Sequence, residues 1–196
     1  MELPAETAVV DDMTGPRALA PLVAATVATV LATACGQTPS PEEAALASVI
    51  RGAQTAELNV EVVPAGYHGP GSSAELIQPA LDHVQTELAK YYVGSLLARK
   101  VTQHQDAIRG MAEAGAGGRI GGVRALDLKD AQVSGATAKV RAEVMVWFKT
   151  AQVWDQSVTS RPEATNIIDL DLQLIKDGGT WKIDQEDSQF APGGGP

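Results

Sequence analysis

The first half of the chain carries apolar side chains at helical spacing, and the second half carries them at alternate positions. Residues 41–57 follow a capping-box pattern made by Ser40 and Glu43, and their apolar side chains recur at helical intervals. The stretch 73–112 shows the same spacing, interrupted at Gly94. The pattern therefore predicts an N-terminal helix, followed by either one long bent helix or two consecutive helices.

Strict alternation of apolar and polar residues begins after a Ser-Gly turn and runs over residues 136–149. Shorter stretches at 123–133, 168–174 and 180–183 also read as strands, with 155–163 as a linker. Helices followed by antiparallel strands indicate an α+β domain in which the N-terminal helices pack on one face of the sheet.

An apolar run at 18–34 ends directly before Cys35, the only cysteine in the chain. From Met13 onward the residues fit a secretory signal, because Arg17 supplies a positive charge before the run. Residues 1–12 contain four acidic side chains and no basic one, so they do not fit the positively charged start of a secretory signal. We therefore expect translation to start at Met13, with a long, atypical leading region as the alternative.

The residues ATAC, which end at Cys35, resemble the lipobox of bacterial lipoproteins, although Ala32 stands where leucine is usual. The resemblance implies that residues 1–34 are removed, that Cys35 is lipidated and that 35–40 form a tether. The protein would then lie on the extracytoplasmic face of the cell membrane. A single-pass anchor that is not cleaved and a soluble secreted protein remain open alternatives.

Residues 41–190 are long enough for a single domain, and 191–196 read as a disordered tail. The chain has a net charge of −9, and its basic residues are scattered rather than gathered in a stripe. This balance argues against a nucleic-acid partner and against electrostatic adhesion to anionic lipid. Membrane attachment would therefore depend on the lipid on Cys35, and with one cysteine no intramolecular disulfide is expected.

The Ser134-Gly135 turn before the long strand, together with the closing sequence DGGTWKI at 177–183, is similar to the NTF2-like superfamily. The resemblance covers about residues 72–187. It implies a cystatin-like α+β cone, in which a curved antiparallel sheet wraps around helices, and a bacterial lipoprotein of actinobacterial type. The implied function is a binding or scaffold module without catalysis that meets a protein partner. The alternative is a carrier or sensor of an apolar small molecule or lipid.

Enzymes of that superfamily place an aspartate or a His–Asp pair inside the cone. Here the inward face of the longest strand offers only Ala, Val and Phe, and Asp169 and Asp171 read as solvated strand residues. The histidines, His68, His83 and His104, show no metal-ligand spacing. We therefore expect no catalytic residue, no cofactor and no metal, with an isomerase or dehydratase as the least favoured function.

Small side chains on the inward face of the long strand would leave space beneath a helix. Tyr91 and Tyr92 lie on that predicted helix, and Val140 and Val144 lie on the strand, so these four residues are the candidate pocket. We expect any pocket there to be apolar and to lack a paired acid and base. Trp181 is expected to close the sheet over the helices as a buried core residue.

Two further features bear on packing. Trp147 lies on the polar face of the long strand, where it would pack on an adjacent strand or on the linker, or be exposed for a partner. Glycines crowd residues 115–122, after a helix and before a strand. That order is the reverse of a dinucleotide-binding loop, so they are expected to form a flexible connection.

Overall fold

The computed structural model describes residues 39–63, 74–114, 116–154 and 157–191. The predicted signal, the Met13 start, Cys35, His68 and all but the first residue of the predicted tail lie outside the described residues. Within the described part of the chain, no helix is long and apolar enough to cross a membrane.

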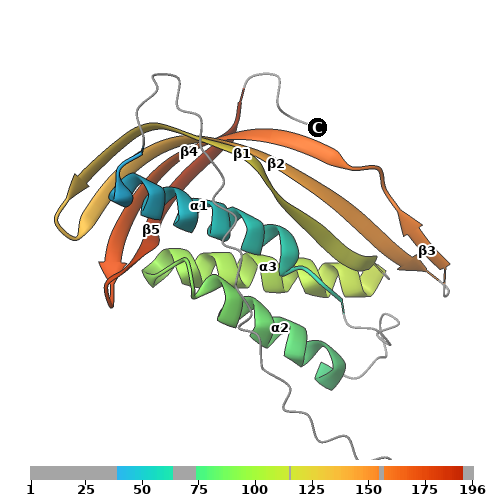
Figure 1. Ribbon diagram of the computed structural model, residues 1–196. Helices are drawn as coiled ribbons and strands as arrows, with labels where there is room; N and C mark the ends of the chain where they lie inside the picture. Colours follow the sequence, from blue (N-terminus) through green and yellow to red (C-terminus); the bar gives the residue numbers. More distant parts are fainter. Residues whose placement is uncertain (1–38, 64–73, 115, 155–156, 192–196) are drawn as a thin grey trace, which may run out of the picture. The chain divides into compact units, whose positions relative to one another are not determined.

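Helices precede strands, as the sequence pattern predicted (Figure 1). The elements are α1 (Pro41–Asn59), α2 (Ala74–Leu88), α3 (Gly94–Ala114), β1 (Ala116–Ser134), β2 (Thr137–Trp154), β3 (Ser157–Ser160), β4 (Ala164–Asp177) and β5 (Thr180–Phe190). The strands form one antiparallel sheet in the order β1-β2-β4-β5, and β3 pairs with β2 beyond the end of β4. The strands bend over the helices, which lie on one side of the sheet. The predicted α+β class, with helices packed on a curved antiparallel sheet, is confirmed.

Local sequence signals explain where the helices begin and break. The backbone N–H of Glu43 donates to Ser40 Oγ (3.2 Å), and the backbone N–H of Ser40 donates to Glu43 Oε2 (2.7 Å), so the predicted capping box starts α1. α2 ends at Leu88, and residues 89–93 form a turn that contains Tyr91 and Tyr92, which corrects their predicted place on a helix. Gly94, with a positive φ of 59°, follows this turn and begins α3. The stretch 73–112 therefore forms two helices rather than one.

All four predicted strands are longer in the structure, and β3 is an additional strand; three of these differences illustrate the cause. β1 begins at Ala116 rather than 123, β5 continues to Phe190 rather than 183, and β3 lies within the predicted 155–163 linker. These added segments lack clear alternation, but each lies beside a longer strand that supplies hydrogen-bond partners. Sheet pairing, not side-chain pattern, therefore sets their length.

The glycine-rich segment is part of β1, which corrects its interpretation as a flexible connection. A Cβ at Gly121 would lie 2.4 Å from the Trp147 carbonyl oxygen and 3.1 Å from Leu58 Cβ. Asn59 Nδ2 donates to the Gly121 carbonyl (2.7 Å), and the Gly121 N–H donates to Asn59 Oδ1 (3.2 Å). The missing side chain thus lets α1 dock on the strand. Trp147 packs over Gly122 on the neighbouring strand, as predicted.

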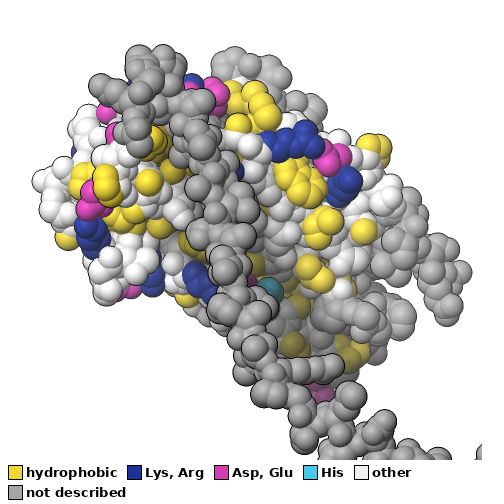
Figure 2. All heavy atoms as spheres, in the orientation of Figure 1, with side chains coloured by type: hydrophobic (Ala, Val, Ile, Leu, Met, Phe, Trp, Pro, Cys, Tyr) yellow, Lys and Arg dark blue, Asp and Glu magenta, His cyan; other side chains and the backbone are white. Residues whose placement is uncertain are grey.

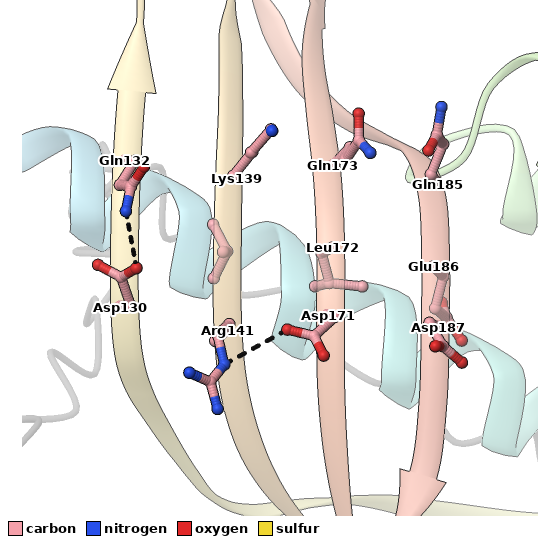
Figure 3. Close-up of a pocket in the computed structure, with 11 residues that line it drawn as sticks. Asp130, Gln132, Lys139, Arg141, Asp171, Leu172, Gln173, Gln185, Glu186 and Asp187 are labelled. Atoms are coloured by element: carbon pink, nitrogen blue, oxygen red, sulfur yellow. Dashed lines mark hydrogen bonds and ion pairs between the residues drawn. The ribbon is translucent and has the colours of Figure 1, made fainter.

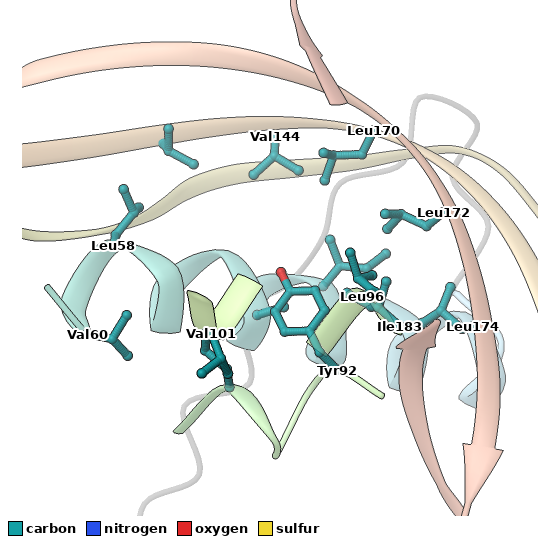
Figure 4. Close-up of a cluster of buried hydrophobic side chains, with 14 of the residues drawn as sticks. Leu58, Val60, Tyr92, Leu96, Val101, Val144, Leu170, Leu172, Leu174 and Ile183 are labelled. Atoms are coloured by element: carbon teal, nitrogen blue, oxygen red, sulfur yellow. The ribbon is translucent and has the colours of Figure 1, made fainter. Parts of the chain in front are cut away.

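The core lies between the helices and the inward face of the sheet (Figure 4). Five inward residues of β2 are buried, namely Ala138, Val140, Ala142, Val144 and Val146, and Phe148 is half-buried. Trp181 is 3% exposed, and its Nε1 donates to Glu42 Oε2 at 2.9 Å. Lys176 Nζ lies 4.7 Å from the centre of the same ring. The predicted burial of Trp181 is confirmed, and Trp181 also joins the start of α1 to the β4–β5 hairpin.

Candidate functional site

A β-bulge decides which side chains of β5 face the helices. Gln173 on β4 pairs with Gln185, whereas the next residue, Leu174, pairs with Ile183, so Asp184 is an extra residue. Trp181 and Ile183 are buried before the bulge. After it the alternation shifts by one position, and Glu186 turns toward the helices, where it meets α3.

Lys100 on α3 lies between two carboxylates that come from different parts of the chain. Its Nζ donates to both oxygens of Glu57 (2.8 and 3.0 Å) and to Glu186 Oε1 (2.7 Å). The side chains of Lys100, Glu57 and Glu186 are 10%, 17% and 4% exposed. An ammonium group has three donors, and all three are used here.

Tyr92, in the turn between α2 and α3, completes this charged group from the core side. Its side chain is fully buried, its hydroxyl donates to Glu57, and the same oxygen lies 3.3 Å from Glu186 Oε2. Lys100 Nζ also lies 5.4 Å from the centre of the Tyr92 ring. Burial, with the charges of both glutamates added to it, raises the pKa of Tyr92 well above its usual value, so the hydroxyl stays protonated.

The two carboxylates have pKa values that move in opposite directions. Burial opposes ionisation of Glu57, but His104 and the Lys100 ammonium outweigh burial and lower its pKa to about 2. Burial and the neighbouring charge of Glu57 raise the pKa of Glu186, against the effect of Lys100. The site thus holds one firmly ionised carboxylate and one that keeps its proton to higher pH, the arrangement that acid–base chemistry uses.

A second layer of ionic contacts continues from this site toward β1. His104 Nδ1 lies 2.7 Å from Glu61 Oε1, while its Nε2 is 3.6 Å from Glu57 Oε2, beyond hydrogen-bond length. Arg119 on β1 pairs with Glu61 (3.1 Å) and donates to the Glu57 carbonyl (3.2 Å). Burial lowers the pKa of His104, but both glutamates outweigh this effect and raise it.

A cavity of about 320 Å³ opens beside Lys100, between α1, α3 and the inward side of β4 and β5. Its lining is mostly polar, with two aliphatic side chains, and consists of Gln54, Glu57, Arg99, Lys100, Gln103, Ile168, Leu170, Glu186 and Ser188. This volume is at the lower end for small-molecule sites, which span about 300–1,000 Å³. The charged group described above forms the floor of the cavity, so we treat the two together as the candidate site.

A different cavity, of about 410 Å³, lies on the outer face of the sheet, with α1 behind it in Figure 3. Its outward-pointing charged residues are solvated, as in the pair Arg141–Asp171 (3.5 Å), whose side chains are 72% and 61% exposed. Glu186 also lines this cavity, but its side chain is buried against Lys100 on the other face. The prediction that Asp171 is a solvated strand residue is confirmed. The exposed ion pair of the outer face thus differs from the desolvated group of the inner site. Figure 2, in the orientation of Figure 1, shows basic, acidic and apolar side chains interspersed on the visible face.

The four residues of the predicted apolar pocket do not line the polar cavity. Tyr92, Val140 and Val144 are buried members of the packed core, where Figure 4 shows Tyr92 among aliphatic side chains. Tyr91 is half-buried and covers Gly52 on α1, where a Cβ would lie 2.3 Å from its ring. Binding of an apolar ligand at these residues is still a prediction.

The sequence offers no candidate ionisable side chain for the inside of the cone, and the structure corrects this. Leu96, Lys100, His104, Ile108 and Ala112 are buried on α3 at intervals of four residues, and Val101 is buried beside them. Lys100 and His104 therefore occupy core positions of an otherwise apolar stripe. That spacing was visible in the sequence and is the signal that could have revealed them. His83, in contrast, is exposed on α2.

Comparison with known proteins gives similarity of structure only. No protein-family model and no curated protein matches the sequence. A periplasmic fragment of TraM has a TM-score of 0.48 and 15% identity, over 74% of this chain and 94% of that chain. An IcmL-like type IV secretion system protein from Legionella pneumophila has a TM-score of 0.43 and 14% identity, over 78% and 96%. An "Ntf2 like protein involved in plasmid conjugation" has a TM-score of 0.39 and 10% identity, over 76% and 48%. Similarity at this level does not extend to function.

The raised pKa of His104 predicts a stability profile that depends on pH. A histidine whose pKa is raised by folding stabilises the native state fully below its unfolded value of about 6.5, and this contribution is lost as pH rises through the folded value. We expect the free energy of unfolding, measured with urea from about pH 6 to pH 9, to fall with rising pH. His104→Gln should flatten this decline.

The matched control is His83→Gln on the exposed surface of α2. Glu186, whose pKa is also raised, contributes a slope of the same sign in both variants. Only the difference between the two histidine variants therefore reports on His104. Equal slopes in both variants would show that the His104 contacts with Glu57 and Glu61 carry no net stabilisation.

Proposed function

We propose that this protein is an extracytoplasmic NTF2-like binding module without catalysis, held at the membrane by a lipid on Cys35. Its ligand is small and polar and occupies the cavity above Lys100. One observation carries this proposal, the desolvated group of Glu57, Lys100 and Glu186 at the floor of an open polar cavity. Desolvated charges in a cleft mark candidate functional sites, because burial of ions is costly and stability alone does not require it.

The polar lining favours this ligand class over the apolar one. An apolar ligand would leave the side-chain amide of Gln54, which is 7% exposed, without solvent or partner. A carrier of apolar molecules would instead have to open the packed core around Tyr92 and Val144. We therefore rank the apolar carrier below the polar binding module.

A ligand screen tests the binding function. Purified protein is mixed with a library of small polar compounds, and binding is followed through the melting temperature and then by calorimetry. Gln103 is exposed at the cavity wall, so Gln103→Trp should block entry without touching the charged floor. Thr102→Trp, exposed on the same helix but outside the cavity lining, is the control. Ligands that bind the wild type and both variants equally would refute the assignment of the cavity.

Membrane attachment is tested separately at Cys35. A single acyl chain gives only marginal membrane binding, and stable anchoring takes two chains, each buried CH₂ contributing about 0.8 kcal/mol. We expect Cys35→Ser to release the protein from the membrane fraction, or to block its processing, with loss of the lipid mass. Unchanged mass and unchanged membrane association in this variant would refute the lipid anchor.

Acid–base catalysis is a second candidate, favoured by the opposite pKa shifts of Glu57 and Glu186 on a shared lysine. In that function Glu186 would hold the exchangeable proton, while Lys100 and Tyr92 stabilise negative charge. Each compound that binds in the ligand screen is then incubated with the wild type and with Glu186→Gln, and its chemical conversion is measured. Conversion by the wild type alone would favour an enzyme over a binding module.

A further inference from the structure

The side-chain amide of Gln54 on α1 makes no hydrogen bond with any described residue. Gln54 is 7% exposed, it lines the cavity beside Lys100, and it has no hydrogen bond to any part of the chain that the structure describes. Buried side-chain amides are normally paired. Among the described residues, the side-chain polar atoms that are fully buried without a hydrogen-bond partner are His104 Nε2 and Arg119 Nε. The amide of Gln54 is not among them, so it is still accessible from the cavity. Gln54 therefore presents a donor and an acceptor to the cavity.

The charged floor, in contrast, has little left to offer a ligand. Lys100 uses its donors on Glu57 and Glu186, and the carboxylate oxygens receive Lys100 and Tyr92. A ligand ammonium would have to displace Lys100 before it could form an ion pair with Glu57 or Glu186. The two carboxylates also repel an anion placed deep in the cavity.

The outer part of the cavity carries a positive charge. Arg99 is exposed, lines the cavity and has no ion pair with any residue in the described ranges. Guanidinium groups bind carboxylates through paired N–H donors. Ile168 and Leu170 supply an aliphatic wall in the same cavity.

We propose that the cavity binds an N-acylated amino acid with a small aliphatic side chain. The amide of the ligand pairs with Gln54, its side chain packs on Ile168 and Leu170, and its carboxylate meets Arg99 at the mouth. This inference rests on the proposed binding function and deepens it by naming the ligand class. It uses two polar side chains of the cavity, Gln54 and Arg99, that pair with no described residue, together with the aliphatic wall beside them.

The experiment is a calorimetric titration of the full-length protein with N-acetyl-L-leucine and four matched probes. N-acetyl-L-leucine amide lacks the carboxylate, 4-methylpentanoate lacks the amide, free L-leucine has an ammonium instead, and N-acetylglycine lacks the side chain. We expect N-acetyl-L-leucine to bind at least about tenfold more tightly than each of the others, since one lost hydrogen bond or charge contact commonly changes affinity by that factor. Equal affinity across the series would overturn the proposal.

Variants assign each contact. Gln54→Leu should weaken N-acetyl-L-leucine at least about tenfold while leaving 4-methylpentanoate unchanged. Arg99→Gln should weaken N-acetyl-L-leucine but not its amide, and Arg99→Lys should restore part of the affinity. Arg109→Gln, exposed on the same helix and paired with Asp106, is the control. No loss of affinity in Gln54→Leu would refute the role given to this residue.

The result separates this inference from the broader function. If other polar compounds bind in a manner that Gln103→Trp abolishes, while N-acetyl-L-leucine does not bind, the ligand class is wrong and the binding module stands. If no compound binds in a manner that depends on Gln103, both fail. Tighter binding of free L-leucine than of its N-acetyl form would show that the charged floor, rather than Gln54, recognises the ligand.

Discussion

Replacing Lys100 with methionine is expected to destabilise the domain by about 3–5 kcal/mol, the usual cost of removing one partner from a buried ion pair. Methionine fills a similar volume, so the main effect is electrostatic. Glu57 and Glu186, 17% and 4% exposed, would lose the cation that they share. The measurement is urea unfolding near neutral pH, and the change is a large share of the roughly 5–15 kcal/mol of a typical domain.

A triple variant keeps this prediction testable even if Lys100→Met fails to fold. Combining Lys100→Met with Glu57→Gln and Glu186→Gln removes all three charges, and replacing a whole buried ionic group is often neutral or stabilising. We therefore expect the triple variant to recover most of the lost stability. If Lys100→Met alone unfolds at the same urea concentration as the wild type, the group is not desolvated as the structure shows.

Truncation of Trp181 is expected to have an effect of the same size for a different reason. Trp181→Ala leaves a large cavity in the core, and changes of this kind cost about 3–5 kcal/mol. The ring is 3% exposed and joins the β4–β5 hairpin to the start of α1 through Glu42. The measurement is again urea unfolding, compared with the wild type at the same pH.

A phenylalanine at the same position separates packing from hydrogen bonding. Trp181→Phe keeps most of the apolar contact but loses the N–H that donates to Glu42. The bond lies near the surface, so we expect a smaller loss than for Trp181→Ala, with about 1 kcal/mol from the hydrogen bond itself. Equal losses for the two variants would show that the hydrogen bond, not the buried ring, stabilises this end of the domain.

The sequence predicted those elements whose signals are local. The capping box at Ser40 and Glu43 sets the start of α1, because it acts within one turn of chain. Gly94 indicated an interruption, but one bent helix was an equal alternative until the structure showed two helices. The inward face of β2 was predicted from alternation alone, since side chains on a strand point to opposite faces in turn. The burial of Trp181 was predicted from its expected place in the strand that closes the sheet over the helices, and it is confirmed.

The limits of β1 and β5 could not be predicted in this way. The glycines of β1 and the polar residues after Ile183 have no alternation, and they become strand only because β2 and β4 run beside them. Backbone hydrogen bonds between strands depend on a partner that is distant in sequence. A local pattern does not contain that information.

By itself, the sequence determined the order of the elements, the start of α1 and the apolar inward face of β2, but it left open whether 73–112 forms one bent helix or two. Only the tertiary structure decided the site, because Glu57, Lys100 and Glu186 lie on separate elements that meet through packing. Glu186 faces Lys100 because one extra residue at Asp184 reverses the alternation of β5. Such a bulge is set by the register of a neighbouring strand, and so the sequence pattern of β5 alone places Glu186 on the wrong face of the sheet.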